Sequence, residues 1–183
     1  MNMNKKILDM GCGMAKIPSA VGVDMNRLPG VDVQWDLDKF PYPLEDNSFD
    51  TVYFRHSLEH LSNPEKAIEE AHRVLKNGGH VEVFTPHFSS LNAFSDLSHK
   101  HYFSLKVFDS YCGLRGSYSG NEPKFALIKR ELSFWKLHDS LPVIPCKLLG
   151  IQFISRKFPT FYERFLPFIF PAMEMHIVLE AKK

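Results

Sequence analysis

The stretch Ile7-Leu8-Asp9-Met10-Gly11-Cys12-Gly13 decides the fold of this chain. Its apolar residues stop at Gly11, which predicts a short buried strand that ends in a tight turn. Glycine at positions 11 and 13 lets the backbone of such a turn approach a ligand closely. Ala15 replaces the third glycine of a dinucleotide-binding turn, so we expect no cradle for a pyrophosphate.

The same strand pattern recurs along the first half of the chain. Residues 21–24 end at Asp24, residues 31–35 are followed by Asp36, and residues 49–54 are rich in β-branched and aromatic side chains. A carboxylate offers paired acceptors and no donor, so Asp24 is suited to bind the hydroxyls of a ribose. The pattern predicts strand ends that meet around a nucleoside.

A helix is predicted from Pro64 to about Leu75. Asn63 is a favoured N-cap residue, and proline is favoured in the first helical turn. Two glycines at positions 78–79 are the expected C-cap, and they precede a strand at residues 80–85. Strands that alternate with helices indicate a parallel sheet covered by helices.

The remaining connections are less regular. The connection at residues 13–21 is too short for the full helix of a parallel crossover, so we expect a shortened first helix. Residues 86–120 are interpreted as functional loops with one helix near residues 104–111. Two further strands are expected at residues 125–135 and 175–181.

Size and composition are those of one globular domain. The chain has 183 residues, of which 44% are hydrophobic and 23% charged, which indicates neither a disordered nor a fibrous protein. We expect a single domain over residues 1–183. It would comprise a cofactor-binding half (1–85), acceptor-side loops and helices (86–172) and a final strand (173–183).

Cysteines and charges bear on location and partners. The three cysteines, Cys12, Cys112 and Cys146, fit neither a disulfide framework nor a metal motif, and the N-terminus lacks the apolar run of a secretory signal. We therefore expect a cytoplasmic protein with reduced thiols.

Residues 1–70 carry 7 basic and 12 acidic side chains, and residues 71–183 carry 15 and 9. A basic second half favours an anionic substrate, a nucleic acid or a membrane surface, and a solvated basic face is the simpler interpretation.

In order and spacing the chain resembles the class I S-adenosylmethionine-dependent methyltransferases, of the small methyltransferase-domain type. Five segments, covering about the first half, carry the resemblance: ILDMGCG, VGVDMN, WDLDKFPYP, DNSFDTVYFRHSLEHL and HRVLKNGGHVEV. It implies an α/β fold, a Rossmann-like three-layer sandwich whose seven-stranded sheet has six parallel strands and one antiparallel strand. It also implies an enzyme that uses S-adenosylmethionine and releases S-adenosylhomocysteine. The shortened first helix and the missing third glycine depart from the family and affect the expected pose of the cofactor.

The resemblance also implies roles for individual residues around the cofactor. The cofactor-binding residues would be Asp9, Gly11 and Gly13 in the methionine-side turn, Asp24 on the ribose, Met25, Asp36 and Leu37 around the adenine, and His56 and Ser57 beside the cofactor.

Methyl transfer from a sulfonium is an in-line displacement, and a hydroxyl acceptor must also lose a proton to a base. Histidine titrates near neutrality, and we predict His60 or His87 as the catalytic base. Other candidates in the same two segments are His56, Glu59, Asp96, His99 and His101.

The segment HSLEH, residues 56–60, is also similar to the ExxEH motif of metal-assisted O-methyltransferases. A divalent ion held by His56, Glu59, His60 and His87 would lower the pKa of an acceptor hydroxyl. An EHL sequence is common in related methyltransferases that use no metal, and we predict no metal ligand in this chain.

We expect a small-molecule acceptor, with an anionic or lipid-linked compound and a homodimer left open. No nucleic acid is expected, because the chain has no RNA-binding module and no dense Arg/Lys stripe. The alternatives are a non-catalytic S-adenosylmethionine-binding module or partner subunit, and an RNA methyltransferase. The aromatic residues 153–173 are too broken in pattern to span a bilayer. They are interpreted first as packing over the sheet face that the shortened first helix leaves thinly covered, and otherwise as a lid, a dimer contact or a lipid-facing surface.

Overall fold

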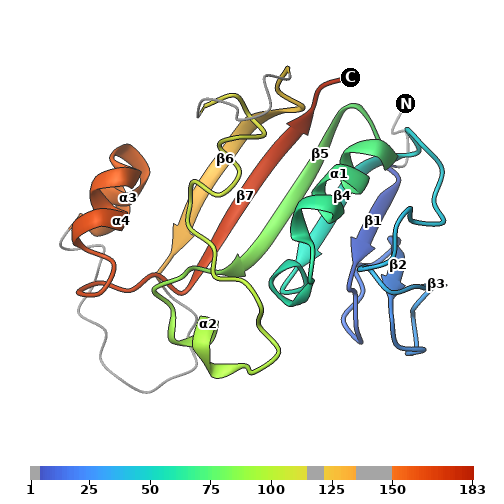
Figure 1. Cartoon of the computed structure of the whole chain (residues 1–183), viewed down its shortest axis with the longest axis horizontal. Helices are drawn as coiled ribbons and strands as arrows, with labels where there is room; N and C mark the ends of the chain where they lie inside the picture. The colour runs from blue at the N-terminus through green and yellow to red at the C-terminus, as the bar shows by residue number, and fades with distance from the viewer. Residues whose placement is uncertain (1–4, 115–121, 135–149) are drawn as a thin grey trace.

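A computed structural model describes residues 5–114, 122–134 and 150–183, and seven strands of these residues form one sheet in the order β3-β2-β1-β4-β5-β7-β6 (Figure 1). The strands are β1 (Ile7–Met10), β2 (Val21–Asp24), β3 (Val33–Gln34), β4 (Phe49–Arg55), β5 (Leu75–Pro86), β6 (Phe125–Ser133) and β7 (Glu174–Ala181). Only β7 is antiparallel to its neighbours, β5 and β6. The expected sheet of six parallel strands and one antiparallel strand is confirmed.

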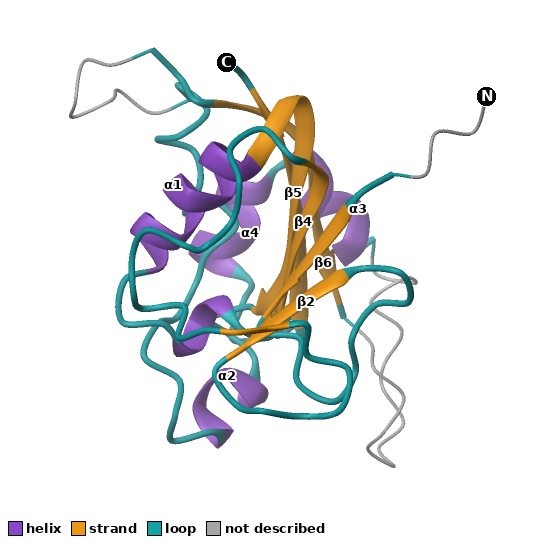
Figure 2. Ribbon diagram, turned by 90° about the vertical axis from the view of Figure 1, so that its right-hand side faces the viewer, coloured by secondary structure: helices purple, strands orange, loops and turns teal. Residues whose placement is uncertain are grey.

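Helices are few and short in the described residues. They are α1 (Pro64–Val74), α2 (Leu91–Ser95), α3 (Ile151–Lys157) and α4 (Pro159–Phe165), together with the 3-10 helix η1 (Leu58–His60). Figure 2 shows the sheet nearly edge-on, with α1 on one side and α3 on the other. No helix of the described residues has the length and the apolar character needed to cross a membrane.

The hydrophobic core lies between α1 and the sheet. The buried face of α1 consists of Ala67, Ile68, Ala71 and Val74. These residues belong to one cluster with fully buried strand residues, among them Leu8, Met10, Val52, Phe54, Val81 and Val83. Asn63 caps the helix as predicted, because its side-chain oxygen accepts a hydrogen bond from Lys66 N at 3.0 Å.

The shortened first helix is replaced by turns, since residues 11–20 contain no helix at all. Strand residues that alternate with the core positions face the side away from α1, and several of them are polar. There Tyr53 donates a hydrogen bond to Glu82 at 3.1 Å, and His176 lies 3.0 Å from the same carboxylate. This face therefore carries paired polar groups in place of a surface for an apolar helix.

Three other expectations need correction. Helix α1 passes directly into β5 at Leu75, so the glycines at 78–79 lie within the strand, where its pairing with β4 is interrupted, and do not form a C-cap. The helix expected at residues 104–111 is a series of turns. Strand β6 ends at Ser133, and Trp135, where its end was expected, lies outside the described residues, as does Cys146. The thiols of Cys12 and Cys112 are free.

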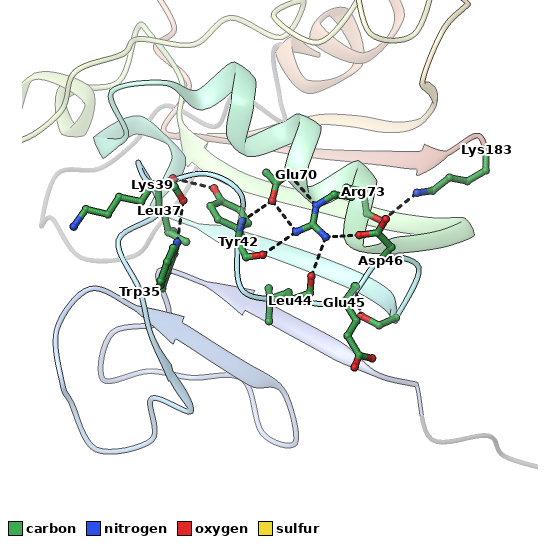
Figure 3. A network of polar contacts seen from close by, with 11 residues as sticks. Trp35, Leu37, Lys39, Tyr42, Leu44, Glu45, Asp46, Glu70, Arg73 and Lys183 are labelled. Atoms are coloured by element: carbon green, nitrogen blue, oxygen red, sulfur yellow. Dashed lines mark hydrogen bonds and ion pairs between the residues drawn. The ribbon is translucent and has the colours of Figure 1, made fainter.

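Arg73, in the last turn of α1, holds the chain that leads from β3 to β4 (Figure 3). Its guanidinium donates to the carbonyl oxygens of Tyr42 (3.0 Å) and Leu44 (2.8 Å) and pairs with the carboxylates of Glu70 (2.8 Å) and Asp46. Glu70 in turn accepts a hydrogen bond from the backbone N of Tyr42 at 2.7 Å. One helix residue thus fixes an otherwise irregular segment.

The same segment carries Leu37, one of the predicted adenine neighbours. The buried hydroxyl of Tyr42 donates to the carbonyl oxygen of Leu37 at 3.0 Å, and burial, reinforced by the nearby Glu70 carboxylate, raises the pKa of that hydroxyl far above its usual range. The phenol therefore stays protonated and can keep donating this bond.

Candidate active site

A cavity of about 390 Å³ opens where β1, β2 and β4 end. Its lining residues are Gly11, Asp24, Met25, Asn26, Asp36, Leu37, Asp38, His56, Ser57, His60, Leu61 and Lys100. We call it the first cavity. All predicted cofactor-binding residues except Asp9 and Gly13 lie around it, so the strand ends do meet at one place.

Asp24 presents a fixed carboxylate to the first cavity. Its Oδ2 accepts a hydrogen bond from Gly13 N and its Oδ1 accepts one from Asn26 N, both at 2.9 Å. Each carboxylate oxygen has a second lone pair, so two acceptor sites remain for hydroxyl groups of a ligand. Gly13 therefore acts behind the cavity, by orienting Asp24.

Gly11 lies in close contact with the end of β4. Its φ is +71°, and a Cβ built at this position would lie 2.5 Å from Cβ of Ser57. The hydroxyl of Ser57 donates to the carbonyl oxygen of Met10 at 2.7 Å and so joins β1 to the turn after β4. Only glycine fits this approach.

Asp9 lies under the turn and does not line the first cavity. It is fully buried and pairs with Arg55 at 2.7 Å, and it accepts a hydrogen bond from Ile17 N at 2.8 Å. Arg55 also donates to the carbonyl oxygen of Ala15. This ion pair holds residues 11–20 in place of the missing helix. No local sequence signal points to Arg55, because its partner Asp9 is remote in the chain.

His56 separates the first cavity from a second cavity of about 240 Å³. The second cavity is lined by His56, Pro86, Asn92, Ser95, Asp96, His99, Met173 and Glu174. His56 has a φ of +52°, which is unusual for a residue with a side chain. The ion pairs with Glu174 (2.7 Å) and Glu59 (3.4 Å) raise the pKa of His56 to about 9. Its imidazole is therefore protonated at neutral pH.

The two predicted bases occupy different environments. His60 lines the first cavity, and its Nδ1 lies 2.9 Å from the hydroxyl of Ser98. His87 is fully buried between Ser89 (2.8 Å) and Glu163 (3.3 Å) and lines neither of these two cavities. His87 therefore contacts α4 through Glu163 and is shielded from a ligand in either cavity. His60 can contact a ligand in the first cavity.

The aromatic segment does not cover the thin sheet face near β1 and β2. Helix α3 contacts β6, at the opposite edge of the sheet, so that interpretation is wrong. Ile151 and Tyr162 are buried, but large apolar side chains remain exposed. We call them the aromatic surface: Phe153, Phe158, Phe161, Phe165, Phe168 and Ile169, which are 50% to 81% exposed.

The sheet order, its single antiparallel strand and a cavity at the glycine turn define the class of protein as one with the Rossmann-like methyltransferase fold. A putative methyltransferase from Bacillus halodurans has a TM-score of 0.58 at 19% identity, with 98% of this chain and 94% of that chain covered. An S-adenosylmethionine-dependent methyltransferase from Archaeoglobus fulgidus has a TM-score of 0.60 at 20% identity, with 96% and 86% covered. At these identities the likeness concerns the fold.

Sequence comparison identifies a domain in the first half of the chain. Residues 8–83 match the family model described as a methyltransferase domain. Sterol 4-C-methyltransferase strm-1 of Caenorhabditis elegans is 26% identical over 151 residues, which are 70% of this chain and 45% of that protein. A ubiquinone biosynthesis O-methyltransferase of Vibrio atlanticus is 29% identical over 109 residues, 48% of this chain and 44% of that protein. The chain thus spans less than half the length of these curated relatives. The domain match over residues 8–83 and the fold together identify an S-adenosylmethionine-dependent methyltransferase domain, whose cofactor is S-adenosylmethionine.

Proposed function

We propose that this chain binds S-adenosylmethionine in the first cavity and transfers its methyl group to a small-molecule acceptor in the second. The observation that carries the proposal is His56, which lines both cavities. Two binding spaces that share a wall are what a two-substrate displacement needs, because donor and acceptor must come into contact. The volume of about 240 Å³ supports a small acceptor group.

The residues around the first cavity suit the parts of the cofactor. The carboxylate of Asp24 would accept hydrogen bonds from the ribose hydroxyls. Met25, Asp36 and Leu37 would surround the adenine, and Gly11 and Ser57 would border the methionine part, beside His56. Asp9 and Gly13 support this site from behind, through their bonds to Ile17 and Asp24.

The acceptor atom attacks the methyl carbon, the C–S bond breaks, and its electron pair remains on the sulfur of S-adenosylhomocysteine. A hydroxyl acceptor must also give up its proton. His56 is protonated in the resting protein and cannot accept it, so His60, which lines the first cavity, is the proposed base. For His87 we propose a positioning role through Glu163, which also accepts a hydrogen bond from Leu105 N at 2.6 Å.

Cofactor affinity and methyl transfer test this function with Asp24→Asn. Hydrogen bonds to a charged group are worth about 1.5–3 kcal/mol, so the variant should bind S-adenosylmethionine roughly 10- to 100-fold more weakly in calorimetry. Glu45→Gln, at an exposed position outside both cavities, is the matched control and should bind normally. Labelled methyl transfer to an acceptor in a cell extract should be lost with Asp24→Asn. Cofactor binding without any labelled product would favour the non-catalytic module, and nuclease-sensitive product would favour an RNA methyltransferase.

We further propose that the acceptor is lipid-linked and is reached at an anionic membrane surface. Six large apolar side chains of the aromatic surface are at least half exposed, which is more than isolated soluble proteins usually leave in one segment. The exposed cations Lys157 and Arg164 lie among them and complement anionic headgroups, while Arg156 pairs with Glu131. The segment continues to Met173 and Glu174, which line the second cavity. Two of the relatives bear names of sterol and ubiquinone enzymes, which agrees with a lipid acceptor.

Vesicle flotation tests the lipid surface. The chain should float with vesicles of phosphatidylcholine and phosphatidylglycerol, and less with phosphatidylcholine alone. The double variant Phe161→Ser/Phe165→Ser should lose this binding, while Ile128→Ser, which removes an exposed apolar side chain on β6, should keep it. A concentration-dependent dimer that the double variant abolishes, without vesicle binding, would assign the surface to a second copy instead. A cytoplasmic location stays a prediction.

A further inference from the structure

Three potential metal ligands converge beside the wall between the two cavities. They are Glu59 and His60 of η1 and His99 from the loop after α2, and one ligand atom of each lies within 4.8 Å of the others. The backbone supports this arrangement, because the carbonyl oxygen of Glu59 accepts hydrogen bonds from Lys100 N (2.9 Å) and His101 N (3.2 Å). The loop that carries His99 is thus tied to η1.

Glu59 is a buried carboxylate with unused acceptor capacity. It is 1% exposed, and only its Oε2 accepts a hydrogen bond, from the hydroxyl of Thr85 at 3.0 Å. Its Oε1 accepts no hydrogen bond from the described residues, although Nδ1 of His56 lies 3.4 Å away. A buried carboxylate oxygen without a hydrogen bond is costly unless something else binds it.

Both histidines are held in the tautomer that leaves Nε2 free to ligate. Nδ1 of His99 lies 2.9 Å from the carbonyl oxygen of Ala93, which can only accept, so the proton sits on Nδ1. Nδ1 of His60 lies 2.9 Å from the hydroxyl of Ser98, and that hydroxyl donates its own proton to Asp96 at 2.6 Å. Histidines that bind metals are commonly fixed by such a bond at the other ring nitrogen.

We propose that Glu59, His60 and His99 bind a divalent transition-metal ion of the zinc class. Two imidazoles and one carboxylate are a ligand set that leaves an open coordination position for a substrate oxygen. Because His60 lines the first cavity and His99 the second, an ion held by these residues would lie beside both cavities. The role of the ion rests on the proposed function: it would bind a hydroxyl acceptor and lower its pKa, and His60 would then be a ligand instead of the base.

This ligand set differs from the one suggested by the motif at residues 56–60. His87 is engaged by Ser89 and Glu163 and is not part of the group. Both ring nitrogens of His56 face carboxylates, Nε2 that of Glu174 and Nδ1 that of Glu59, so His56 is not a ligand either. His99 takes the place of His87. His99 joins the group because the loop after α2 packs against η1. Sequence spacing cannot predict such a contact.

Metal binding is tested on the untagged, metal-stripped full chain without cofactor. Zn²⁺ binding is measured by calorimetry, and Co²⁺ is added because its visible absorption bands report histidine and carboxylate coordination. His99→Ala should weaken Zn²⁺ binding by roughly 100-fold or more, and Ser98→Ala, which keeps all three ligands, by roughly 10- to 100-fold. His80→Ala, which removes a histidine that pairs with Glu180 outside both cavities, should bind as the parent does.

Two results would overturn the site: no binding of either ion by the parent chain, or an affinity that His99→Ala and Ser98→Ala leave unchanged. Circular dichroism of Ser98→Ala shows whether a loss of affinity reflects unfolding, and a folded variant with weaker binding supports the site. Calorimetry with S-adenosylmethionine is carried out separately. A chain that binds Zn²⁺ but not the cofactor would contradict the proposed function and leave the metal site intact, and the reverse result would contradict only the metal site.

Discussion

Nε2 of His56 lies 2.7 Å from Oε2 of Glu174, so the first residue of β7 contacts the residue that directly follows β4. The strands β4 and β7 are not neighbours in the sheet, since β5 lies between them. The contact therefore crosses the end of β5 and closes the wall between the two cavities. The arrangement of this wall thus depends on the protonated imidazole of His56.

The His56 contact predicts a defined dependence of stability on pH. The pKa of His56 is raised from 6.5 to about 9, so its stabilising contribution is complete below pH 6.5 and is lost as the pH rises through about 9. His56→Asn, a residue that tolerates positive φ, should lower the melting temperature below pH 6.5. Above pH 9 the two proteins should melt more nearly alike. A difference that stays constant over this range would show that the charge on His56 does not contribute.

The two glycines of the turn should respond differently to the same substitution. Gly11→Ala and Gly13→Ala both place a side chain at positive φ, which costs about 1–2 kcal/mol. At Gly11 the new Cβ also meets Ser57, and such overpacking adds about 1–3 kcal/mol, whereas at Gly13 nothing lies within 4 Å. Urea unfolding should therefore rank Gly11→Ala as the less stable variant. Equal losses would mean that the close approach to Ser57 is unimportant.

The buried ion pair under the turn predicts a non-additive pair of substitutions. Arg55→Met leaves the fully buried carboxylate of Asp9 without its partner, which should cost about 3–5 kcal/mol of unfolding free energy. The double variant Asp9→Asn/Arg55→Met removes the charge as well and should recover part of this loss. The free energies are measured by urea unfolding of the parent, both single variants and the double variant. Additive effects would argue against direct coupling.

Removal of Arg73 should loosen the segment before β4. Arg73→Met removes the donor to the carbonyls of Tyr42 and Leu44 and unpairs Glu70, for an expected loss of about 2–3 kcal/mol. Cofactor affinity should fall as well, because Leu37 depends on the same segment. Arg27→Met, at an exposed position, is the matched control and should change unfolding little. If Arg73→Met is less stable but binds the cofactor with unchanged affinity, the contacts of Arg73 do not influence the first cavity.

Much of the first half of the chain was predictable from sequence because its signals are local. An apolar strand that stops at a glycine or an acid marks a strand end, and parallel strands bring such ends together at one edge of a sheet. Gly11, Asp24, Asp36 and Leu37 could therefore be expected at a common site. Asn63 was recognisable as an N-cap because its partner, Lys66, is three residues away.

The failures concern contacts between remote residues. The glycines at 78–79 suit a C-cap, but pairing of Leu75 with Phe49 of β4 begins the strand earlier, so tertiary structure overrides the local preference. The burial of His87 depends on Glu163 of α4, and the position of His99 depends on Ala93 and η1. Histidine-rich loops give no periodicity from which such partners can be read.

The anchor of the glycine turn lies 46 residues downstream of Asp9, on the strand that ends at Arg55. Residues 11–20 have no helix that could form early from local contacts. We therefore expect them to reach their final conformation only after β4 has docked. The nascent chain would therefore complete the first cavity late. A fragment that stops before Arg55 would contain every glycine and acid of the motif and still lack the means to hold them in place.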